Sequence, residues 1–389
     1  MSSFEKALQR QLEQIEQDSL YRQRKSLETP QQPHIRIDGK DFLAFCSNDY
    51  LGLANHPDLI QTMVTAANTW GVGSSSSHLV IGHQQVHHDL EQALAEFVGY
   101  PRALLFSSGY MANIGAIKSL IGQGDDTFHD YLDHASLLDG GWLSRARFQR
   151  FAHSDYDDLE KLLAASRALS PESKRLVVSD SVFSMDGEIA DIPILSSTAK
   201  QQDAWLMIDD AHGLGVLGEN GSGILSHWGV STDAVEVYVG TLGKAFGCAG
   251  AFVASSELVI ETLIQSARTY IYTTAIPPAI AATILKALEI VRNEQWRRDK
   301  LNELIEYFKR GAEEIGLPLM PSTTAIQPLL YISTEKTLQV SDALAKQGIL
   351  ITPIRPPTVP KNTSRLRVTL SASHSKVDID RLFKVLAEV

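Results

Sequence analysis

The chain has 389 residues, 44% of them hydrophobic and 21% charged, and a formal net charge of −11. A chain of this length exceeds a single hydrophobic core, so we expect two domains, and the composition is typical of a globular enzyme. The acidic charge argues against a nucleic-acid partner, because such binding draws most of its affinity from Lys and Arg side chains that neutralise phosphates.

The cysteines and the apolar pattern indicate a cytoplasmic location. Cys46 and Cys248 are the only two cysteines and lie far apart, so the sequence offers no disulfide framework, and we expect both to fill the core. No apolar run reaches membrane-spanning length, and the N-terminus lacks a basic and then apolar signal. We therefore expect a cytoplasmic protein with no membrane contact.

The N-terminal residues 3–25 are expected to form an amphipathic helix that packs on another surface. The apolar residues at helical spacing are Phe4, Leu8, Leu12 and Ile15. After a proline-containing break, residues 41–53 are expected to form a short strand that runs into a polar turn. Asn48 in that turn can bond to a ligand carboxylate or to its own backbone.

A loop rich in Ser and Gly, residues 71–82, precedes the next helix, which has an apolar face and Gly99 as its expected C-cap. The apolar positions are Val86, Leu90, Leu94 and Phe97. His83 and His87 stand four residues apart and could share a helix face as a zinc pair. No third ligand is in view, so we expect no metal.

A strand over residues 103–106, a turn of small residues and a helix over residues 110–120 form the next unit. Backbone N–H groups at such a helix N-terminus point outward and can cradle a phosphate. Further strands are expected at residues 175–180 and 205–208, with a helix between them. This alternation predicts a mostly parallel sheet with helices on both faces.

In such sheets, ligands bind beyond the carboxyl ends of the strands. Seven small or polar residues lie at or just after the predicted strand ends. They are Gly109, His134, Ser184, Asp209, His212, Thr241 and Lys244. We expect these seven positions to converge on one site, where His134 could lie flat against an aromatic cofactor ring or only cap a helix.

Lys244 follows a β-branched strand and lies among glycines and other small residues. An amine enclosed by backbone and apolar groups is poorly hydrated, which lowers its pKa and makes it a usable nucleophile or base. Pyridoxal phosphate (PLP) needs such an amine for its Schiff base, and a carboxylate such as Asp209 would keep its pyridinium nitrogen protonated. The sequence therefore predicts PLP as the cofactor.

Two glycine patterns near Lys244 fit other ligands less well. The stretch from Gly240 to Ala245 has too few residues between its glycines, and no Ser or Thr after the lysine, for a P-loop. A second set of glycines has the spacing of a dinucleotide fingerprint, but it lies four residues beyond its strand and no helix is expected to follow. We therefore expect neither a P-loop nor an NAD site.

The C-terminal part is expected to form a second, smaller domain. An extended segment over residues 270–278 ends at two prolines, and a helical run follows. Residues 327–332 and 365–370 are the predicted strands of a small sheet. Arg355 lies in a proline-rich loop, from which its planar fork can bind a carboxylate. The predicted parts are an N-terminal helix and strand segment (1–49), a large PLP-binding domain (50–287) and a small C-terminal domain (288–389).

Five motifs follow one another along the chain. They are Ser47-Asn-Asp-Tyr-Leu-Gly, Asp133-His-Ala-Ser, Phe183-Ser-Met-Asp-Gly, Asp209-Asp-Ala-His-Gly and Gly240-Thr-Leu-Gly-Lys-Ala-Phe-Gly. From about Arg22 to the C-terminus the chain thereby resembles the α-oxoamine synthases, PLP enzymes of the aspartate aminotransferase fold. The resemblance implies the α/β architecture of fold type I, with a mostly parallel large-domain sheet and a smaller C-terminal α/β domain.

The resemblance also implies a role for each matching position. Lys244 would bind PLP covalently, Asp209 would hold the pyridinium nitrogen, and His134 would stack on the ring. His212, helped by Ser184, would bond to the phenolic oxygen of the cofactor. The other cofactor-binding residues would be Gly109, Tyr110 and Thr241, with Thr273 and Thr274 reaching the phosphate from a partner subunit. The substrate-binding residues would be Asn48 and Arg355 at the amino-acid carboxylate, His134 and Thr358 beside the substrate, and Arg22 at the far carboxylate of a dicarboxylic acyl chain.

Two further stretches, Ala325-Ile-Gln-Pro-Leu and Ile354-Arg-Pro-Pro-Thr-Val-Pro, resemble the biotin-pathway branch of that family. This resemblance implies a decarboxylative condensation of L-alanine with pimeloyl-CoA or pimeloyl-acyl carrier protein, catalysed by a homodimer with its active site at the subunit interface. The alternatives are a sister enzyme that uses glycine, an aminotransferase of the same fold and a cofactor-binding regulator.

Three features are left open by the sequence. Arg145, Arg147 and Arg150 could dock an acidic carrier protein or form a solvated face. Many relatives have a glycine-rich stretch where this chain has four serines, Ser74 to Ser77, so the backbone there could approach a substrate differently. Relatives often have Glu where Asp180 stands, which leaves the role of that position unassigned.

Overall fold

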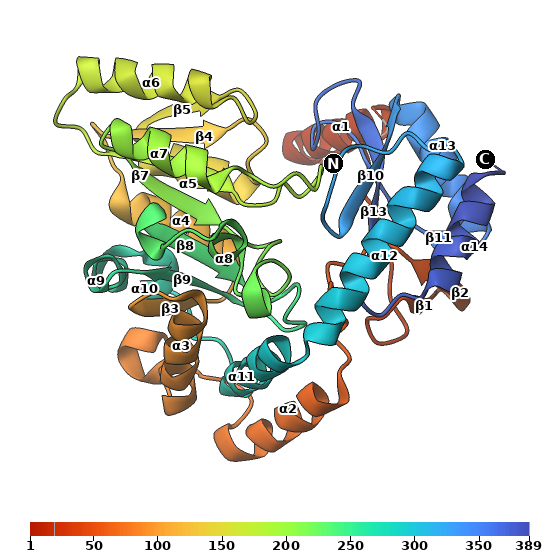
Figure 1. Cartoon of the computed structure of the whole chain (residues 1–389), viewed down its shortest axis with the longest axis horizontal. Helices are drawn as coiled ribbons and strands as arrows, with labels where there is room; N and C mark the ends of the chain where they lie inside the picture. The colour runs from red at the N-terminus through yellow and green to blue at the C-terminus, as the bar shows by residue number, and fades with distance from the viewer. Residues whose placement is uncertain (19, 389) are drawn as a thin grey trace.

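The computed structural model describes residues 1–18 and 20–388. Its largest sheet has seven strands in the order β3-β9-β8-β7-β6-β4-β5 (Figure 1). The strands are β3 (Arg102–Phe106), β4 (Asp126–Asp130), β5 (Arg147–Phe151), β6 (Arg175–Asp180), β7 (Trp205–Asp209), β8 (Val237–Thr241) and β9 (Ala251–Ser255). Among these strands β9 alone runs in the direction opposite to the other six, which confirms the mostly parallel sheet.

Helices cover both faces of this sheet. Successive residues of a strand point to opposite faces, so each strand contributes side chains to two cores. Leu105 and Ile208 belong to the core on one face, and Leu104 and Met207 to the core on the other. The helices of the first core include α3 (Gln85–Val98), α6 (Tyr156–Leu169), α7 (Ile192–Gln201) and α8 (Ile224–Trp228). Those of the second include α4 (Gly109–Leu120), α5 (Ala135–Ser144), α9 (Glu257–Ser266) and α10 (Arg268–Ile271).

The N-terminal and C-terminal segments of the chain share a small sheet. β1 (His34–Ile37) pairs with β2 (Lys40–Ala44), and β11 (Ile349–Leu350) adds to β2 in parallel. The N-terminal strands therefore lie with the C-terminal region in space (Figure 1). The boundaries at residues 49 and 287 stay predictions.

A second small sheet confirms the two predicted C-terminal strands. It is antiparallel, in the order β10-β13-β12, and consists of β10 (Ile326–Ile332), β12 (Thr352–Ile354) and β13 (Ser364–Thr369). The helices around it are α12 (Gln295–Glu314), α13 (Thr334–Lys346) and α14 (Lys376–Leu386). The expected helical run after Pro278 is divided into α11 (Pro278–Asn293) and α12.

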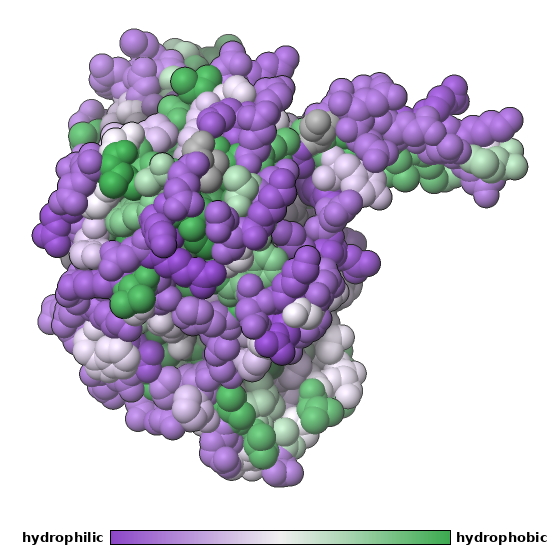
Figure 2. All heavy atoms as spheres, turned by 90° about the vertical axis from the view of Figure 1, so that its right-hand side faces the viewer, coloured by the Kyte–Doolittle hydropathy of each residue, from purple (hydrophilic) through white to green (hydrophobic). Residues whose placement is uncertain are grey.

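The N-terminal helix is shorter than predicted. α1 runs over Ser3–Gln17, whereas residues 20–25 have no helical structure and Ser19 lies outside the described residues. No residue of α1 is buried, and Phe4 is 73% exposed. Figure 2 shows α1 as an arm that extends from the body of the molecule. The apolar face that the spacing predicts thus has no partner within the described chain.

The segment expected to be extended at residues 270–278 is helical at its start. Tyr270 and Ile271 belong to α10, although aromatic and β-branched residues favour strands. The Tyr270 ring packs against His78 and Phe106, with centroid distances of 5.0 and 5.9 Å. This tertiary packing outweighs local propensity. A further helix, α2 (Pro57–Trp70), has no counterpart in the sequence-based assignment.

None of the described helices is both long and apolar enough to cross a membrane.

Candidate active site

Lys244 lies in the turn between β8 and β9, at the carboxyl end of the parallel strands. Backbone hydrogen bonds hold this turn, including one from the N–H of Gly247 to the carbonyl of Lys244. The Lys244 amine lies 2.9 Å from Nε2 of His212. Burial lowers the pKa of Lys244 to about 8, although the carboxylates of Asp209 and Asp180 oppose that shift. The structure therefore provides the poorly hydrated amine that the sequence predicts.

Asp209 ends β7 and is almost fully buried. Its carboxylate accepts one hydrogen bond from Nδ2 of Asn113, on α4, at 2.7 Å and another from the backbone N–H of Ala211 at 3.0 Å. These two donors fix the orientation of the carboxylate. A fixed buried carboxylate beside an amine suits the protonated ring nitrogen of PLP.

His134 is the N-cap of α5, and its Nδ1 accepts from the backbone N–H of Ser136 at 3.3 Å. The Ser136 hydroxyl lies 2.7 Å from the same nitrogen, so the proton of the neutral ring must be on Nε2. Burial lowers the pKa of His134, which favours the neutral ring. The ring therefore presents an N–H donor to the cavity.

Asp180, whose role the sequence left open, holds the backbone of His134. Its Oδ2 accepts from the N–H of His134 at 2.7 Å, and its own N–H donates to Oδ1 of Asp133 at 3.1 Å. Burial, reinforced by the nearby charge of Asp209, raises the pKa of Asp180 well above its usual value. Asp180 thus anchors the backbone at the start of α5, where His134 lies.

His212 bonds to a group on each of its ring nitrogens. Nε2 faces Lys244, and Nδ1 lies 2.6 Å from the hydroxyl of Tyr50. Burial, together with the charges of Lys244 and Arg367, lowers the pKa of His212 well below its usual value, so the ring is neutral. Arg367, on β13, donates to Oδ1 of Asn48 from both terminal nitrogens, at 3.2 and 3.1 Å.

These groups surround a cavity of about 470 Å³, here called the Lys244 cavity. Its polar and glycine lining includes Asn48, Gly109, Tyr110, Asn113, His134, Asp180, Asp209, His212, Thr241 and Lys244. A Cβ added at Gly109 would lie 2.8 Å from Cγ2 of Thr241, so only glycine fits there without a shift. The N-terminus of α4, capped by Ser108, faces the same space with its free N–H groups. The donor set therefore fits PLP, with its phosphate at the helix N-terminus and its ring nitrogen at Asp209.

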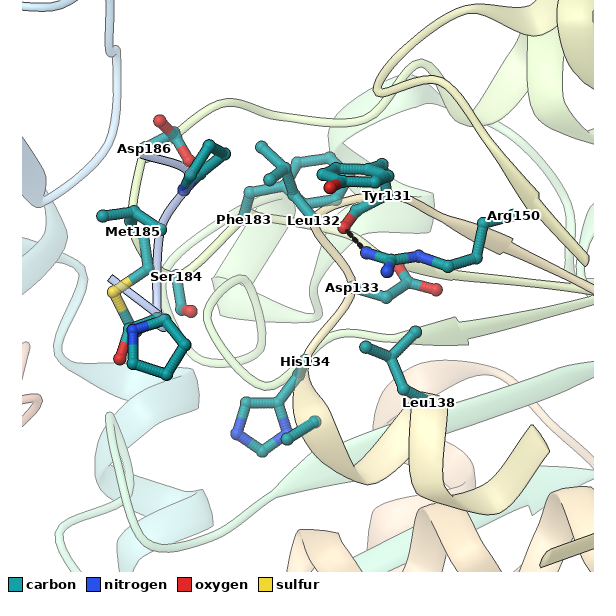
Figure 3. A pocket seen from close by; sticks show the side chains of 15 residues that line it. Tyr131, Leu132, Asp133, His134, Leu138, Arg150, Phe183, Ser184, Met185 and Asp186 are labelled. Atoms are coloured by element: carbon teal, nitrogen blue, oxygen red, sulfur yellow. Dashed lines mark hydrogen bonds between the residues drawn. The ribbon is translucent and has the colours of Figure 1, made fainter. Parts of the chain in front are cut away.

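A second cavity of about 450 Å³ is drawn in Figure 3. His134 lines both this cavity and the Lys244 cavity, so the two adjoin there. The lining of the second cavity includes Phe183, Ser184, Met185, Leu138 and Thr358, with Arg150 at one side. Figure 3 shows Ser184 and Met185 across the cavity from Leu138, with His134 between them. This mostly apolar space is suited to an acyl chain or a pantetheine arm.

Four of the predicted site residues line neither cavity. They are Arg22, Thr273, Thr274 and Arg355. Arg355 bonds to the carbonyl of Tyr21 at 3.4 Å, and Thr274 pairs with Ser77 in an isolated bridge. A second bond joins the serine stretch to the segment that contains Thr273 and Thr274, because the hydroxyl of Ser74 donates to the carbonyl of Ile276 at 2.7 Å. A role for Thr273 and Thr274 in a partner's site stays a prediction.

Three residues of the site were not predicted from the sequence: Tyr50, Asn113 and Arg367. Tyr50 lies in the same motif as Asn48, and Asn113 lies one helical turn from the glycine turn at Gly109, so both had a positional signal. Arg367 had a different signal, because a buried strand that carries an arginine needs a polar partner for it. No residue spacing could reveal that this partner is Asn48.

Arg147 and Arg150 of the basic cluster, and His87 of the histidine pair, have partners in the structure. Arg147 forms two hydrogen bonds with the buried Asp126, and Arg150 lies over the Tyr131 ring with its carbon 4.0 Å from the centroid. Both nitrogens of His87 are occupied, by the N–H of Gln84 and the carbonyl of Ile276. Within residues 1–18 and 20–388, no group of three or more His, Cys, Asp or Glu side chains is arranged to hold a metal.

The fold and the groups around Lys244 define a PLP-dependent enzyme of fold type I. The sequence profile of the class I and II aminotransferases matches residues 40–386. Among solved structures, serine palmitoyltransferase from S. paucimobilis with bound PLP superposes with a TM-score of 0.92 at 29% identity, over 100% of this chain and 98% of that one. The 8-amino-7-oxononanoate synthase of Francisella tularensis superposes with a TM-score of 0.78 at 30% identity, over 89% and 97%.

Curated relatives are more similar still. The chain is 57% identical over 369 residues to the 8-amino-7-oxononanoate synthase of Pseudomonas syringae pv. syringae (strain B728a), covering 95% of this chain and 92% of the relative. It is 56% identical to that of Ectopseudomonas mendocina (strain ymp), covering 95% and 94%. The chain belongs to the class I and II aminotransferase family and, within it, to the 8-amino-7-oxononanoate synthases, PLP-dependent acyltransferases of biotin synthesis.

Proposed function

We propose that the protein condenses L-alanine with a pimeloyl thioester, releasing the thiol and CO2 and giving 8-amino-7-oxononanoate. The observation that carries this proposal is the position of His134, which lines both cavities. A reaction between an amino acid and an acyl chain needs two adjoining spaces that meet at the reacting atoms. The relatives at 57% and 56% identity, which are named for this product, support the choice of substrates.

The cofactor site is prepared by buried hydrogen bonds. PLP, when bound at Lys244, supplies an electron sink that makes the α-proton of an amino acid removable. Asp209 favours a protonated ring nitrogen, and the bonds from Asn113 and Ala211 keep its carboxylate in place for that task. Because these donors are already oriented, little reorganisation is needed during the reaction.

Lys244 is the base in this proposal, once the amino group of alanine has replaced it on the cofactor and freed its amine. With a pKa of about 8, a useful fraction of its amine is neutral near pH 7.5 and can take the α-proton of alanine on Nζ. The Cα electron pair then forms a bond to the thioester carbonyl carbon, and the carbon–sulfur bond breaks to release the thiolate. Loss of the alanine carboxyl group as CO2 returns an electron pair to Cα, which takes a proton from Lys244.

The alanine carboxylate is assigned to Arg367 with Asn48. Arg367 is buried within reach of the Lys244 cavity, and its charge acts on both Lys244 and His212. Its guanidinium can bind a carboxylate through two parallel hydrogen bonds. Neither arginine lines a cavity, but Arg367 bonds to Asn48, which lines the Lys244 cavity, whereas Arg355, for which the resemblance implies this role, bonds to the carbonyl of Tyr21. We therefore give the α-carboxylate to Arg367, and keep Arg22 as the candidate for the far carboxylate of the acyl chain and Thr358 as a further substrate contact.

His134 is assigned to the acyl carbonyl oxygen. Its Nδ1 is occupied by Ser136, so its Nε2–H is the group free to donate. This donor lies at the junction of the two cavities, where the new carbon–carbon bond would form. A donor at that point stabilises negative charge on the oxygen.

A second copy of the chain is part of this proposal. The apolar face of α1 has no partner within the described chain, and Val72, Val80 and Ile81 are 83%, 71% and 80% exposed in the loop before α3. Such apolar surface is typical of a protein–protein interface. The loop also pairs with the segment of Thr273 and Thr274, so a second copy bound here would bring both threonines to the interface. Sedimentation of an Ile81→Glu variant should show single chains where the native protein shows pairs.

The substrates are tested by product mass. The cofactor-loaded protein is incubated with pimeloyl-CoA and L-alanine and, in parallel, with succinyl-CoA or acetyl-CoA and glycine. We expect the mass of 8-amino-7-oxononanoate from the first mixture and at least tenfold less product from the others. Product from a glycine mixture alone would assign the chain to a sister activity, and amino-group exchange without thiol release would make it an aminotransferase.

A further inference from the structure

A series of hydrogen-bonding side chains connects Arg367, on β13, to the Lys244 amine. Arg367 donates to Asn48, whose Oδ1 lies 3.3 Å from the hydroxyl of Tyr50. That hydroxyl lies 2.6 Å from Nδ1 of His212, and Nε2 of His212 lies 2.9 Å from Nζ of Lys244. Tyr50 is 1% exposed, so its hydroxyl is shielded from bulk solvent.

The hydroxyl proton of Tyr50 has two possible acceptors, Oδ1 of Asn48 and Nδ1 of His212. The amide oxygen of Asn48 has two lone pairs, and the two terminal nitrogens of Arg367 already donate to it at 3.2 and 3.1 Å. The distance from Tyr50 to that oxygen is at the long end for a hydrogen bond between oxygens, whereas the distance to His212 is short. The hydroxyl therefore donates to Nδ1 of His212, and the ring proton is on Nε2.

We infer that Tyr50 is a positioning residue that fixes the tautomer of His212, so that His212 presents its Nε2–H toward Lys244 and the cofactor. The inference rests on the proposed function, in which Lys244 is the base and the cofactor-binding amine. Tyr50 itself touches no reacting atom in this account. It acts by donating a hydrogen bond to Nδ1 of His212, the ring nitrogen that faces away from Lys244.

This tautomer has a consequence for the Lys244 amine. An N–H donor 2.9 Å from Nζ favours the neutral amine, which can accept, over the ammonium ion, which can only donate. Without the Tyr50 hydroxyl, the ring is free to carry its proton on Nδ1 and to turn the lone pair of Nε2 toward the amine. The ammonium ion would then gain an acceptor and persist to higher pH.

The test compares Tyr50→Phe with Tyr100→Phe. Tyr100 is also buried, and its hydroxyl donates to the carbonyl of Val235 at 2.8 Å, away from Lys244. The rate of PLP capture by the cofactor-stripped chain is measured from pH 6 to pH 10, because capture needs the neutral amine. We expect Tyr50→Phe to raise the pH midpoint by about one unit, which makes capture about tenfold slower at pH 7, with native rates restored at pH 10. Tyr100→Phe should keep the native midpoint.

A purely structural role for Tyr50 predicts a different pattern. Loss of packing or folding would lower capture by the same factor at every pH and leave the midpoint in place, and that result would overturn the inference. A second measurement needs no substitution at Tyr50. In the ¹⁵N-histidine-labelled native protein, the signal that His212→Gln removes should report a protonated Nε2, and a protonated Nδ1 would also overturn it.

Failure of this inference can be told from failure of the proposed function. PLP capture requires no acyl donor, so its midpoint can shift whether or not the product forms. An unchanged midpoint in Tyr50→Phe, with native product formation from alanine and pimeloyl-CoA, would refute the role of Tyr50 alone. A shifted midpoint in a protein that makes no such product would refute the substrates alone.

Discussion

Asn113 and Asp209 form a buried hydrogen bond of 2.7 Å, which joins α4 to the carboxyl end of β7. The amide of Asn113 also donates to the hydroxyl of Ser136 at 2.9 Å. The Asn113 side chain therefore orients both Asp209, whose carboxylate is proposed to bind the ring nitrogen of PLP, and Ser136, which sets the tautomer of His134.

Replacing Asn113 should weaken cofactor binding. Asn113→Ala leaves Asp209 without one of its two donors, and a hydrogen bond to a charged group contributes about 1.5–3 kcal/mol, so the dissociation constant for PLP should rise about 10- to 100-fold. Absorbance titration of the stripped chain with PLP measures this change. Asn68→Ala, at an exposed position of α2 where the amide bonds only to the carbonyl of Val64, is the matched control. Equal PLP affinity in the two variants would refute this role.

Arg367 and Arg355 make opposite predictions for alanine. Arg367→Lys keeps the charge but loses the planar fork, so the KM for L-alanine should rise about 10- to 100-fold while the KM for the thioester changes less. Arg355→Lys should change the KM for L-alanine by less than about twofold, because Arg355 bonds to the carbonyl of Tyr21, outside the Lys244 cavity, whereas Arg367 bonds to Asn48 in its lining. Steady-state kinetics on both variants measure the difference. A rise in the KM for L-alanine confined to Arg355→Lys would return the α-carboxylate to the residue that the resemblance implies.

Glu91 should make the protein less stable as the pH rises. On α3, its Oε1 accepts from the N–H of Leu105, on the free edge of β3, and burial raises its pKa to about 7. A carboxyl group whose pKa is higher in the folded state stabilises the fold fully below its unfolded pKa of about 4.3, and that contribution is lost as the pH rises through about 7.

Glu91→Gln keeps the acceptor and removes the titration. We expect its melting temperature to match that of the native protein near pH 4.5 and to exceed it at pH 8.5. The difference at pH 8.5 should correspond to about 1–3 kcal/mol in the free energy of unfolding. Glu96→Gln, at an exposed position of the same helix, removes an ion pair with Arg292 but no buried carboxyl group, and is the control. A difference between native and Glu91→Gln that does not depend on pH would contradict the assignment.

His153 should contribute stability up to a higher pH than Glu91 does. Burial alone would lower its pKa, but hydrogen bonds to Asp130 at 2.8 Å and Glu188 at 3.3 Å raise it to about 10. The contribution of this charged ring is complete below the unfolded pKa of about 6.5 and is lost as the pH rises through about 10. We expect His153→Gln to lower the melting temperature at pH 6, with a gap that closes near pH 10.5. His88→Gln, at an exposed site on α3, should show no such gap at either pH.

The large sheet and most of the Lys244 cavity were predictable from sequence for a physical reason. Parallel strands end at one edge of the sheet, so residues that follow different strands, such as His134, Asp209 and Lys244, must lie close together. Arg367 comes from another sheet and meets Asn48 only after the C-terminal region has folded over the site. That contact depends on tertiary packing, which no local pattern encodes.

The same limit applies to α1 and Tyr270. The helical spacing of Phe4 and Leu8 correctly predicted an amphipathic helix, but it could not show that both side chains are exposed in the described chain. The composition around Tyr270 favours a strand, and only packing of the ring on His78 and Phe106 selects the helix. Propensity decides such short segments only where tertiary contacts are weak.

The most direct test of the account measures CO2 and thiol together. Cofactor-loaded protein is given pimeloyl-CoA and L-alanine labelled with ¹³C in the carboxyl group, and both products are counted against 8-amino-7-oxononanoate. We expect one ¹³CO2 and one CoA for each product molecule, and a rate at least about 1,000-fold lower in Lys244→Ala, because the base and the covalent cofactor link are both lost. Thiol release without ¹³CO2, or full activity in Lys244→Ala, would contradict the proposed condensation at this site.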